Sequence, residues 1–131
     1  MFSGLAVVLG VAAFGVSMPG LAQPGSLAML DALAKGEWTV RFRDGTASRK
    51  ICLQDGRELI QLQHSENNCS RFVVEDGQAQ VTVQYTCAGN GYGRTSIRRE
   101  NNSLAQIESQ GIADGLPFQF TAEARRTGVC N

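Results

Sequence analysis

Four cysteines are the residues of this chain whose chemistry is easiest to define from type and spacing. No two of them lie close together in the sequence, whereas a zinc site normally uses close pairs such as Cys-x-x-Cys. The spacing therefore disfavours a metal centre, and we expect no metal ligands. An even number of cysteines in a short exported chain is typical of a disulfide framework, which predicts disulfide bonds at Cys52, Cys69, Cys87 and Cys130.

The pairing of these cysteines depends on the hairpin that follows Cys69. Asp76-Gly77 is a preferred two-residue turn, and such a turn would place Cys69 opposite Gln84. Because successive side chains of a strand point to opposite faces of the sheet, Cys69 and Cys87 would then lie on different faces. Of the three connectivities open to four cysteines, we favour Cys52–Cys69 together with Cys87–Cys130.

Residues for acid–base or nucleophilic catalysis are sparse. His64 is the only histidine, and we expect it on the surface, because nothing in the sequence supplies the third group that orients a catalytic base. The glutamates are scattered, and no pattern brings two of them within the roughly 5 to 9 Å that paired-carboxylate catalysis requires. Gly89-x-Gly91-x-Gly93 resembles a phosphate loop, but no helix follows it, as the dinucleotide fingerprint requires. The sequence therefore predicts no catalytic residues, no cofactor and no enzyme activity.

Residues 1–22 have the layout of a secretory signal peptide. Leu5 to Val16 is an uncharged apolar run, and Gly20 and Ala22 are small residues placed for cleavage before Gln23. The run is shorter than the roughly 20 residues that span a bilayer. It lacks the usual basic residues in front of it, so an uncleaved anchor is the alternative. We expect export to the periplasm and no membrane span once the signal is removed.

The mature chain would be one domain, residues 23–131, which carries all twelve basic and all twelve acidic residues. This neutral balance argues against nucleic-acid binding, which usually shows a basic excess. Arginines still cluster locally, as in Arg49-Lys50 and Arg98-Arg99. Such clusters form either a solvated strand face or an anion-binding patch, and the sequence leaves both open.

Alternation of apolar and polar residues predicts strands over most of the domain. The alternation is clearest in Trp38, Val40 and Phe42. We expect the stretch 111–117, which lies between two strand segments, to be a loop. Two short helices are predicted, one from the N-cap Ser26 to Gly36 and one over 54–64. The strand segments are 37–43, a strand through Ile51 and Leu53, 72–75, 78–86, 94–100, 103–110 and 118–125.

The connections between these strands are too short for parallel crossovers, so the sheet should be antiparallel with one buried face. This predicts an all-β fold: a small antiparallel β-barrel or sandwich of about seven strands with one or two short helices. Two disulfides would help a chain of this length, which is otherwise marginal in the surface it can bury.

Four aromatic residues are candidates for contact with a ligand or partner. Trp38, Phe118 and Phe120 fall on buried phases of strands, where they form either plain core or a pocket for a small apolar ligand. Tyr92 lies in a glycine-rich turn, where an exposed ring could meet an envelope protein or another envelope component.

The order of several motifs resembles that of a family of uncharacterised exported bacterial domains, known only as a domain of unknown function. The motifs are a Gly-x-Trp-x-Val strand at Gly36, a Cys-Leu strand end at Cys52 before a short helix, the cysteines Cys69 and Cys87, and a Gly-x-Cys tail at Cys130. A Met-rich insert common after the first strand of that family is missing here. The resemblance implies a periplasmic location and supplies no activity.

A second resemblance is to periplasmic metalloprotease inhibitors, which are small exported β-barrels that also open with Gly-x-Trp. Their N-terminal segment blocks the protease, and its counterpart here would be residues 23–35. We therefore expect a non-catalytic binding or interaction module of unknown partner, with a protease-inhibitor-like barrel protein as the alternative.

Overall fold

The computed structural model describes residues 4, 10–16 and 25–131 of the chain. Most of the predicted signal peptide and its cleavage site at Gln23 lie outside the described residues. Residues 10–16 have no helix or strand and are exposed. Among the residues that the structure describes, no helix is long and apolar enough to cross a membrane.

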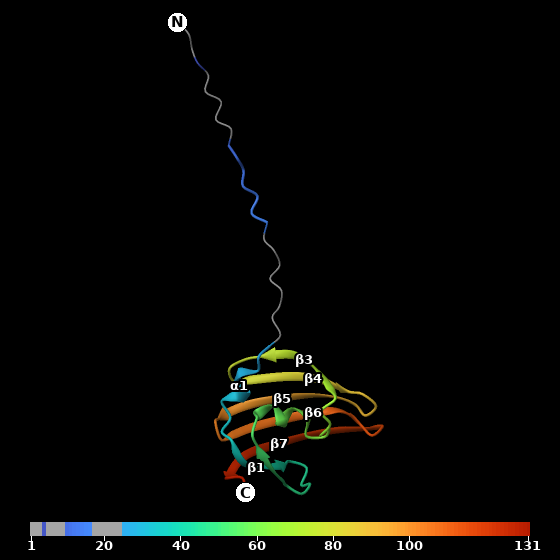
Figure 1. Cartoon of the computed structure of the whole chain (residues 1–131). Coiled ribbons are helices and arrows are strands. Elements are labelled where there is room, and N and C mark those ends of the chain that lie inside the picture. The colour runs from blue at the N-terminus through green and yellow to red at the C-terminus, as the bar shows by residue number, and fades with distance from the viewer. Residues whose placement is uncertain (1–3, 5–9, 17–24) are drawn as a thin grey trace.

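The folded part is a single antiparallel sheet of seven strands (Figure 1), which confirms the predicted all-β class. Two short helical elements accompany it, α1 and η1. The strand order is β2-β1-β7-β6-β5-β4-β3. The elements are α1 (Ala28–Asp31), β1 (Gly36–Phe42), β2 (Arg49–Leu53), η1 (Gly56–Gln61), β3 (Cys69–Asp76), β4 (Gln80–Cys87), β5 (Gly91–Asn101), β6 (Leu104–Ala113) and β7 (Leu116–Gly128).

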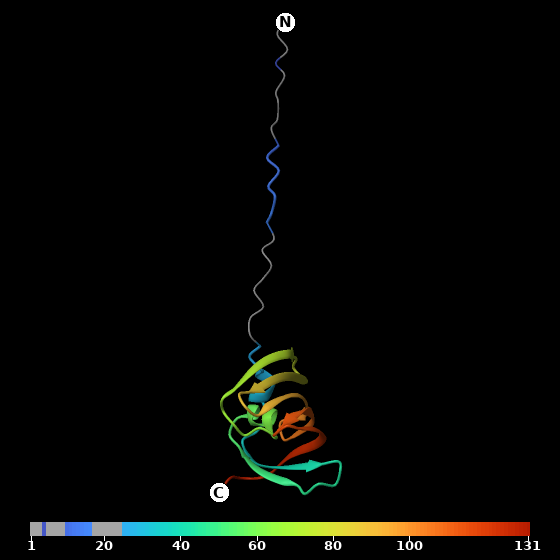
Figure 2. The same cartoon turned by 90° about the vertical axis from the view of Figure 1, so that its right-hand side faces the viewer.

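The order of the strands explains how the sheet is built. β3 to β7 follow one another as a run of hairpins, and β1 then pairs with β7 and leaves β2 outermost. The sheet curves strongly, but it does not close into a barrel, so β2 and β3 remain as two edges. Figure 2 shows α1 and η1 lying within the curve of this open sheet.

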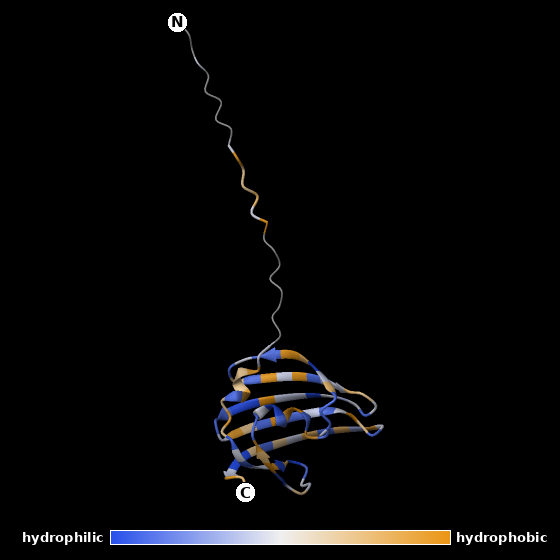
Figure 3. Cartoon of the chain, in the orientation of Figure 1, coloured by the Kyte–Doolittle hydropathy of each residue, from blue (hydrophilic) through white to orange (hydrophobic). Residues whose placement is uncertain are grey.

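The inner face of the sheet forms the core together with these two helical elements. Alternate residues of the strands point inward, which gives the alternating apolar and polar bands in Figure 3. Leu59 and Ile60 of η1 and Leu30 of α1 are fully buried against them. The interior is therefore filled by the chain's own side chains.

The helix predicted from Ser26 to Gly36 is wrong in its extent, since α1 covers only Ala28–Asp31. Leu27 precedes it in the left-handed conformation with φ 56°, and no side chain caps the helix. Leu27, Leu30 and Leu33 are all buried on the inner side of the sheet. Packing of these leucines decides the path of so short a segment, because one helical turn has little stability of its own.

The second predicted helix is present as the 3₁₀ helix η1. Asp55 accepts a hydrogen bond from the backbone of Arg57, and Glu58 reaches back to the backbone N–H of Gln54 (3.0 Å) and of Asp55 (3.4 Å). This confirms the capping box expected from the sequence. The cap fixes the start of η1 directly after β2.

The favoured disulfide pairing is wrong. The bonds join Cys52 to Cys130 and Cys69 to Cys87. Two features move the register of the β3–β4 hairpin. The chain turns over Gly77 to Gln80, so that Asp76 faces Val81, and a bulge at Val74 adds one residue to β3. Because of this one extra residue in β3, Cys69 lies directly opposite Cys87, and both side chains point to the same face of the sheet.

The other disulfide joins β2 to the segment that follows β7, a strand that is not its neighbour in the sheet. Glu37 of β1 faces Cys52 of β2 on one side and Gly128 of β7 on the other. The bond from Cys52 to Cys130 therefore passes across the start of β1. It links the edge strand β2 covalently to the residues that follow β7.

Candidate functional site

The four aromatic residues that the sequence singled out lie in different environments. Trp38 is fully buried and donates its indole N–H to the carbonyl of Ala34 (2.8 Å). Phe120 is buried and meets Phe42 edge to face, with 5.2 Å between ring centroids. Phe118 lies at the rim of the core and stacks on Phe120. The structure thus places Trp38 and Phe120 in the core.

Tyr92 differs from these three because 55% of it is exposed on the outer face of β5. It lines a hollow of about 580 Å³ that also touches Phe118 and the outward side chains of β4, β6 and β7. Tyr92 and Phe118 are the two sequence candidates that the structure brings to one hollow.

This hollow continues along the outer face of the sheet. A second hollow of about 250 Å³ shares Arg94, Gln110 and Gln119 with the first. A third of about 360 Å³ shares Ser96 and Glu108 with the second. Together they form one continuous depression across β4 to β7, which we call the outer groove.

A row of side chains on successive strands crosses the groove. The strand pairings set Phe72 beside Gln84, Gln84 beside Arg94, Arg94 beside Gln110, and Gln110 beside Gln119. Neighbouring strands lie about 4.8 Å apart, so the row is roughly 19 Å long. Within the described part of the chain, the three amides and the guanidinium of Arg94 make no side-chain hydrogen bond to protein, which leaves them free for a ligand.

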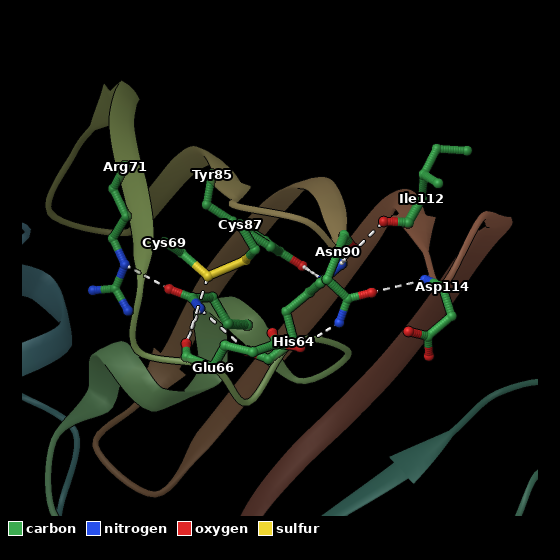
Figure 4. The surroundings of a disulfide bond; sticks show 10 residues. His64, Glu66, Cys69, Arg71, Tyr85, Cys87, Asn90, Ile112 and Asp114 are labelled. Atoms are coloured by element: carbon green, nitrogen blue, oxygen red, sulfur yellow. Dashed lines mark hydrogen bonds between the residues drawn. A yellow bond between two sulfur atoms is a disulfide. The ribbon is translucent and has the colours of Figure 1, made fainter.

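The histidine expected on the surface is buried, with 1% of its surface exposed. Its Nε2–H donates to the carbonyls of Asn90 (2.9 Å) and Ile112 (3.0 Å), and its Nδ1 shares a hydrogen bond with the hydroxyl of Tyr85 (2.8 Å). Figure 4 shows this ring between the turn at Asn90 and β6. Both ring nitrogens of His64 thus hold the loop 62–68 against β4, the turn at Asn90 and β6.

Polar groups around the Cys69–Cys87 bond complete this loop cluster (Figure 4). The amide of Asn90 donates to Glu66, which holds the pKa of that carboxyl below its usual range, and the amide oxygen of Asn90 accepts from the backbone N–H of Asp114 (2.9 Å). Burial, with a smaller contribution from Glu66, raises the pKa of Tyr85 to about 12. These shifts follow from a structural network that ties three loops together.

Glu66, Cys69 and Cys87 also offer three potential metal-ligand atoms within 4.8 Å of one another. Both sulfurs are joined in a disulfide, whereas a metal binds the thiolate form of cysteine. The oxidised cluster therefore lacks the donor atoms of a metal centre.

Comparisons with known proteins give no relative for this chain. A scan against models of protein families found no match, and searches of curated proteins and of solved structures found no similar protein. The fold and the site define the class instead: a disulfide-linked, open antiparallel sheet with a filled interior and a polar groove on its outer face.

Proposed function

We propose that this protein is an exported, non-catalytic binding module that holds a polysaccharide chain of the cell envelope in the outer groove. The observation that carries the proposal is the free row of Gln84, Arg94, Gln110 and Gln119 beside the exposed ring of Tyr92. Export and the family resemblance remain predictions from the sequence.

The chemistry of the row suits a sugar chain. A side-chain amide has both donors and acceptors, and a sugar hydroxyl is itself donor and acceptor, so the two groups satisfy each other. An aromatic ring such as Tyr92 offers an apolar face for the C–H face of a pyranose ring and keeps a polar tip in water. The amides recur at the spacing of the strands, which suits a ligand with a regular repeat.

Two buried groups that could take part in a reaction, His64 and Thr95, have structural partners in the described residues. His64 is saturated with hydrogen bonds. The buried hydroxyl of Thr95 lies between the carbonyl of Ile60 (2.7 Å) and the hydroxyl of Ser109 (2.8 Å). This supports binding without catalysis.

The apolar-ligand hypothesis and the inhibitor alternative gain no support from specific contacts. Trp38 and Phe120 are packed in the core, where they leave little of their surface for a ligand. In the segment that would block a protease, Leu27, Leu30 and Leu33 are buried beneath the sheet. We therefore do not favour either as the function.

Cosedimentation with purified peptidoglycan sacculi, and calorimetry with the peptide-free glycan strands released from them, test the proposal. Replacing Gln84, Gln110 and Gln119 together by alanine removes three hydrogen-bonding groups. Each bond contributes about 1 kcal/mol, so the Kd for glycan strands should rise roughly 100-fold.

A matched control removes the same number of exposed glutamines from outside the groove. These are Gln54, Gln63 and Gln78, and their triple alanine variant should bind as the wild type does. Equal binding by the two triple variants, or no binding of glycan strands by the wild type, would reject the proposal.

A further inference from the structure

A hollow of the described chain lies where the sheet fails to close. It has a volume of about 710 Å³ and is bounded by β2, by η1 with the loop 62–68, and by β3. We call it the edge cleft. Its size is in the range of small-molecule sites, which is about 300 to 1,000 Å³. It is formed by different strands from the outer groove, so it can act independently of the function proposed above.

Two arginines enter this cleft from opposite edges of the sheet. Arg49 of β2 donates to the carbonyl of Leu62 (2.8 Å), and Arg71 of β3 donates through Nε to the side chain of Gln61 (2.9 Å). Both are thus fixed on adjacent residues at the end of η1. In Figure 4 the terminal nitrogens of Arg71 point away from the disulfide.

Neither arginine has a carboxylate partner in the part of the chain that the structure describes. Arg57, which also lines the cleft, gives the contrast, since it pairs with Asp31 (2.7 Å) and Asp55 (3.0 Å). The hydrogen bond to Asp31 raises the pKa of Arg57, whereas partial loss of water lowers the pKa of Arg71. Among the described residues Arg71 therefore has no direct ion pair, although the charge of Asp55 acts on it in the opposite sense to burial.

Two carboxylates line the cleft. Glu58 accepts the backbone N–H groups that begin η1. One oxygen of Glu66 accepts from Asn90, and its second oxygen is buried without a hydrogen-bond partner among the described residues. Ile51 and Leu62 supply apolar surface to the same cleft. An occupant would thus meet two guanidinium groups that have no ion-pair partner among the described residues, beside apolar surface.

We propose that the edge cleft binds the phosphate group of a small organic phosphate. Arg49 on the β2 side and Arg71 on the β3 side donate hydrogen bonds to the phosphate oxygens. A guanidinium fork matches a phosphate in geometry and gives strong charge-assisted hydrogen bonds. The apolar wall takes the organic body of the same ligand.

Titration of the ¹⁵N-labelled oxidised protein with phenyl phosphate, followed by NMR, tests this site. Saturable shifts are expected in the backbone signals of residues 49–71. Arg49→Gln and Arg71→Gln should each weaken binding roughly tenfold or more, and the double variant should abolish it. Arg41→Gln is the matched control, because it removes the same charge from an arginine whose side chain is 72% exposed on β1, and it should bind as the wild type does.

A second arm separates the two sources of such a phosphate. Vesicles of phosphatidylglycerol that retain the wild type but lose the double variant would identify a lipid headgroup as the source, and binding of phenyl phosphate alone would identify a free phosphate ester. Either result supports the cleft. Equal loss in Arg41→Gln, or the absence of saturable binding to both probes in a wild type whose spectrum is folded, would overturn it.

Discussion

The two disulfides should contribute unequally to stability, and the difference can be worked from the structure. The bond from Cys52 to Cys130 closes a sequence separation of 78 residues, and the bond from Cys69 to Cys87 closes one of 18. Loop-closure entropy grows with the logarithm of this separation. It gives about 4.5 kcal/mol for the longer loop and about 3 kcal/mol for the shorter one at 25 °C.

Urea unfolding of two double alanine variants measures this difference. The variant without Cys52 and Cys130 should lose about 1 kcal/mol more of its free energy of unfolding than the variant without Cys69 and Cys87. Its m-value should also rise more, because a longer cross-link constrains the unfolded chain more and its removal exposes more surface on unfolding. Alanine is used because a serine hydroxyl at the buried Cys87 would add a cost of its own.

The reasoning fails if the variant without Cys69 and Cys87 loses more free energy of unfolding than the variant without Cys52 and Cys130, while the two m-values are equal. Tryptic mapping of the unreduced protein provides the control, since it must recover Cys52 with Cys130 and Cys69 with Cys87. A peptide joining Cys52 to Cys69 would show that the pairing itself, and with it the register of β3, is wrong.

Two further predictions concern buried groups. In a Tyr92→Phe background, the tyrosinate absorbance of Tyr85 should rise with a midpoint near pH 12. Because the folded state raises this pKa from 10.0, its stabilising effect is complete below pH 10 and is lost as the pH rises to about 12. That loss amounts to roughly 2 to 3 kcal/mol in urea unfolding, and Tyr85→Phe should abolish it; an equal alkaline loss in that variant would contradict the assignment. Gly111→Ala should destabilise the protein by roughly 2 kcal/mol or more, because the added Cβ would overlap the carbonyl oxygen of Tyr92 and lie 2.7 Å from the Cα of Gly93. Gly128→Ala meets nothing within 4 Å, so equal thermal melting points for these two glycine variants would refute the steric argument.

Strands were predictable from the sequence because side-chain alternation is a local property. Trp38, Val40 and Phe42 point inward as their spacing indicates, and so do Phe120 and Ala122. The capping box of η1 was predictable for the same reason, since Asp55 and Glu58 are three residues apart and contact each other's backbone.

Turns were less predictable, as two Asp-Gly pairs illustrate. Asp76-Gly77 was expected to be a two-residue turn, yet Asp76 ends β3, faces Val81, and is followed by the connection 77–79. Asp114-Gly115 lies in the stretch expected to be a loop, yet both residues have positive φ and join β6 directly to β7. The same dipeptide gives different turns because the pairing of the flanking strands decides the register.

The outer groove and the buried histidine depend on contacts distant in the sequence, so no local pattern identifies them. His64 is separated by 26 residues from Asn90 and by 48 from Ile112, which accept its hydrogen bonds. From the sequence, each glutamine in the row could be predicted to point outward from its own strand, but their position beside one another could not be predicted. Their alignment follows from three strand pairings that the sequence does not specify.

The open edge of the sheet follows from what the sheet encloses. Closing β2 onto β3 would need the space that η1 and the loop 62–68 now occupy, and Leu59 and Ile60 of η1 are fully buried there. An open sheet must protect its edges from pairing with other chains. On β3 the bulge at Val74 disrupts the edge, and on β2 the disulfide at Cys52 and the charge of Arg49 do the same. The cleft between these edges thus results from filling the interior with helical residues. Arg49, which protects the β2 edge, is also one of the two arginines that we propose to bind the phosphate.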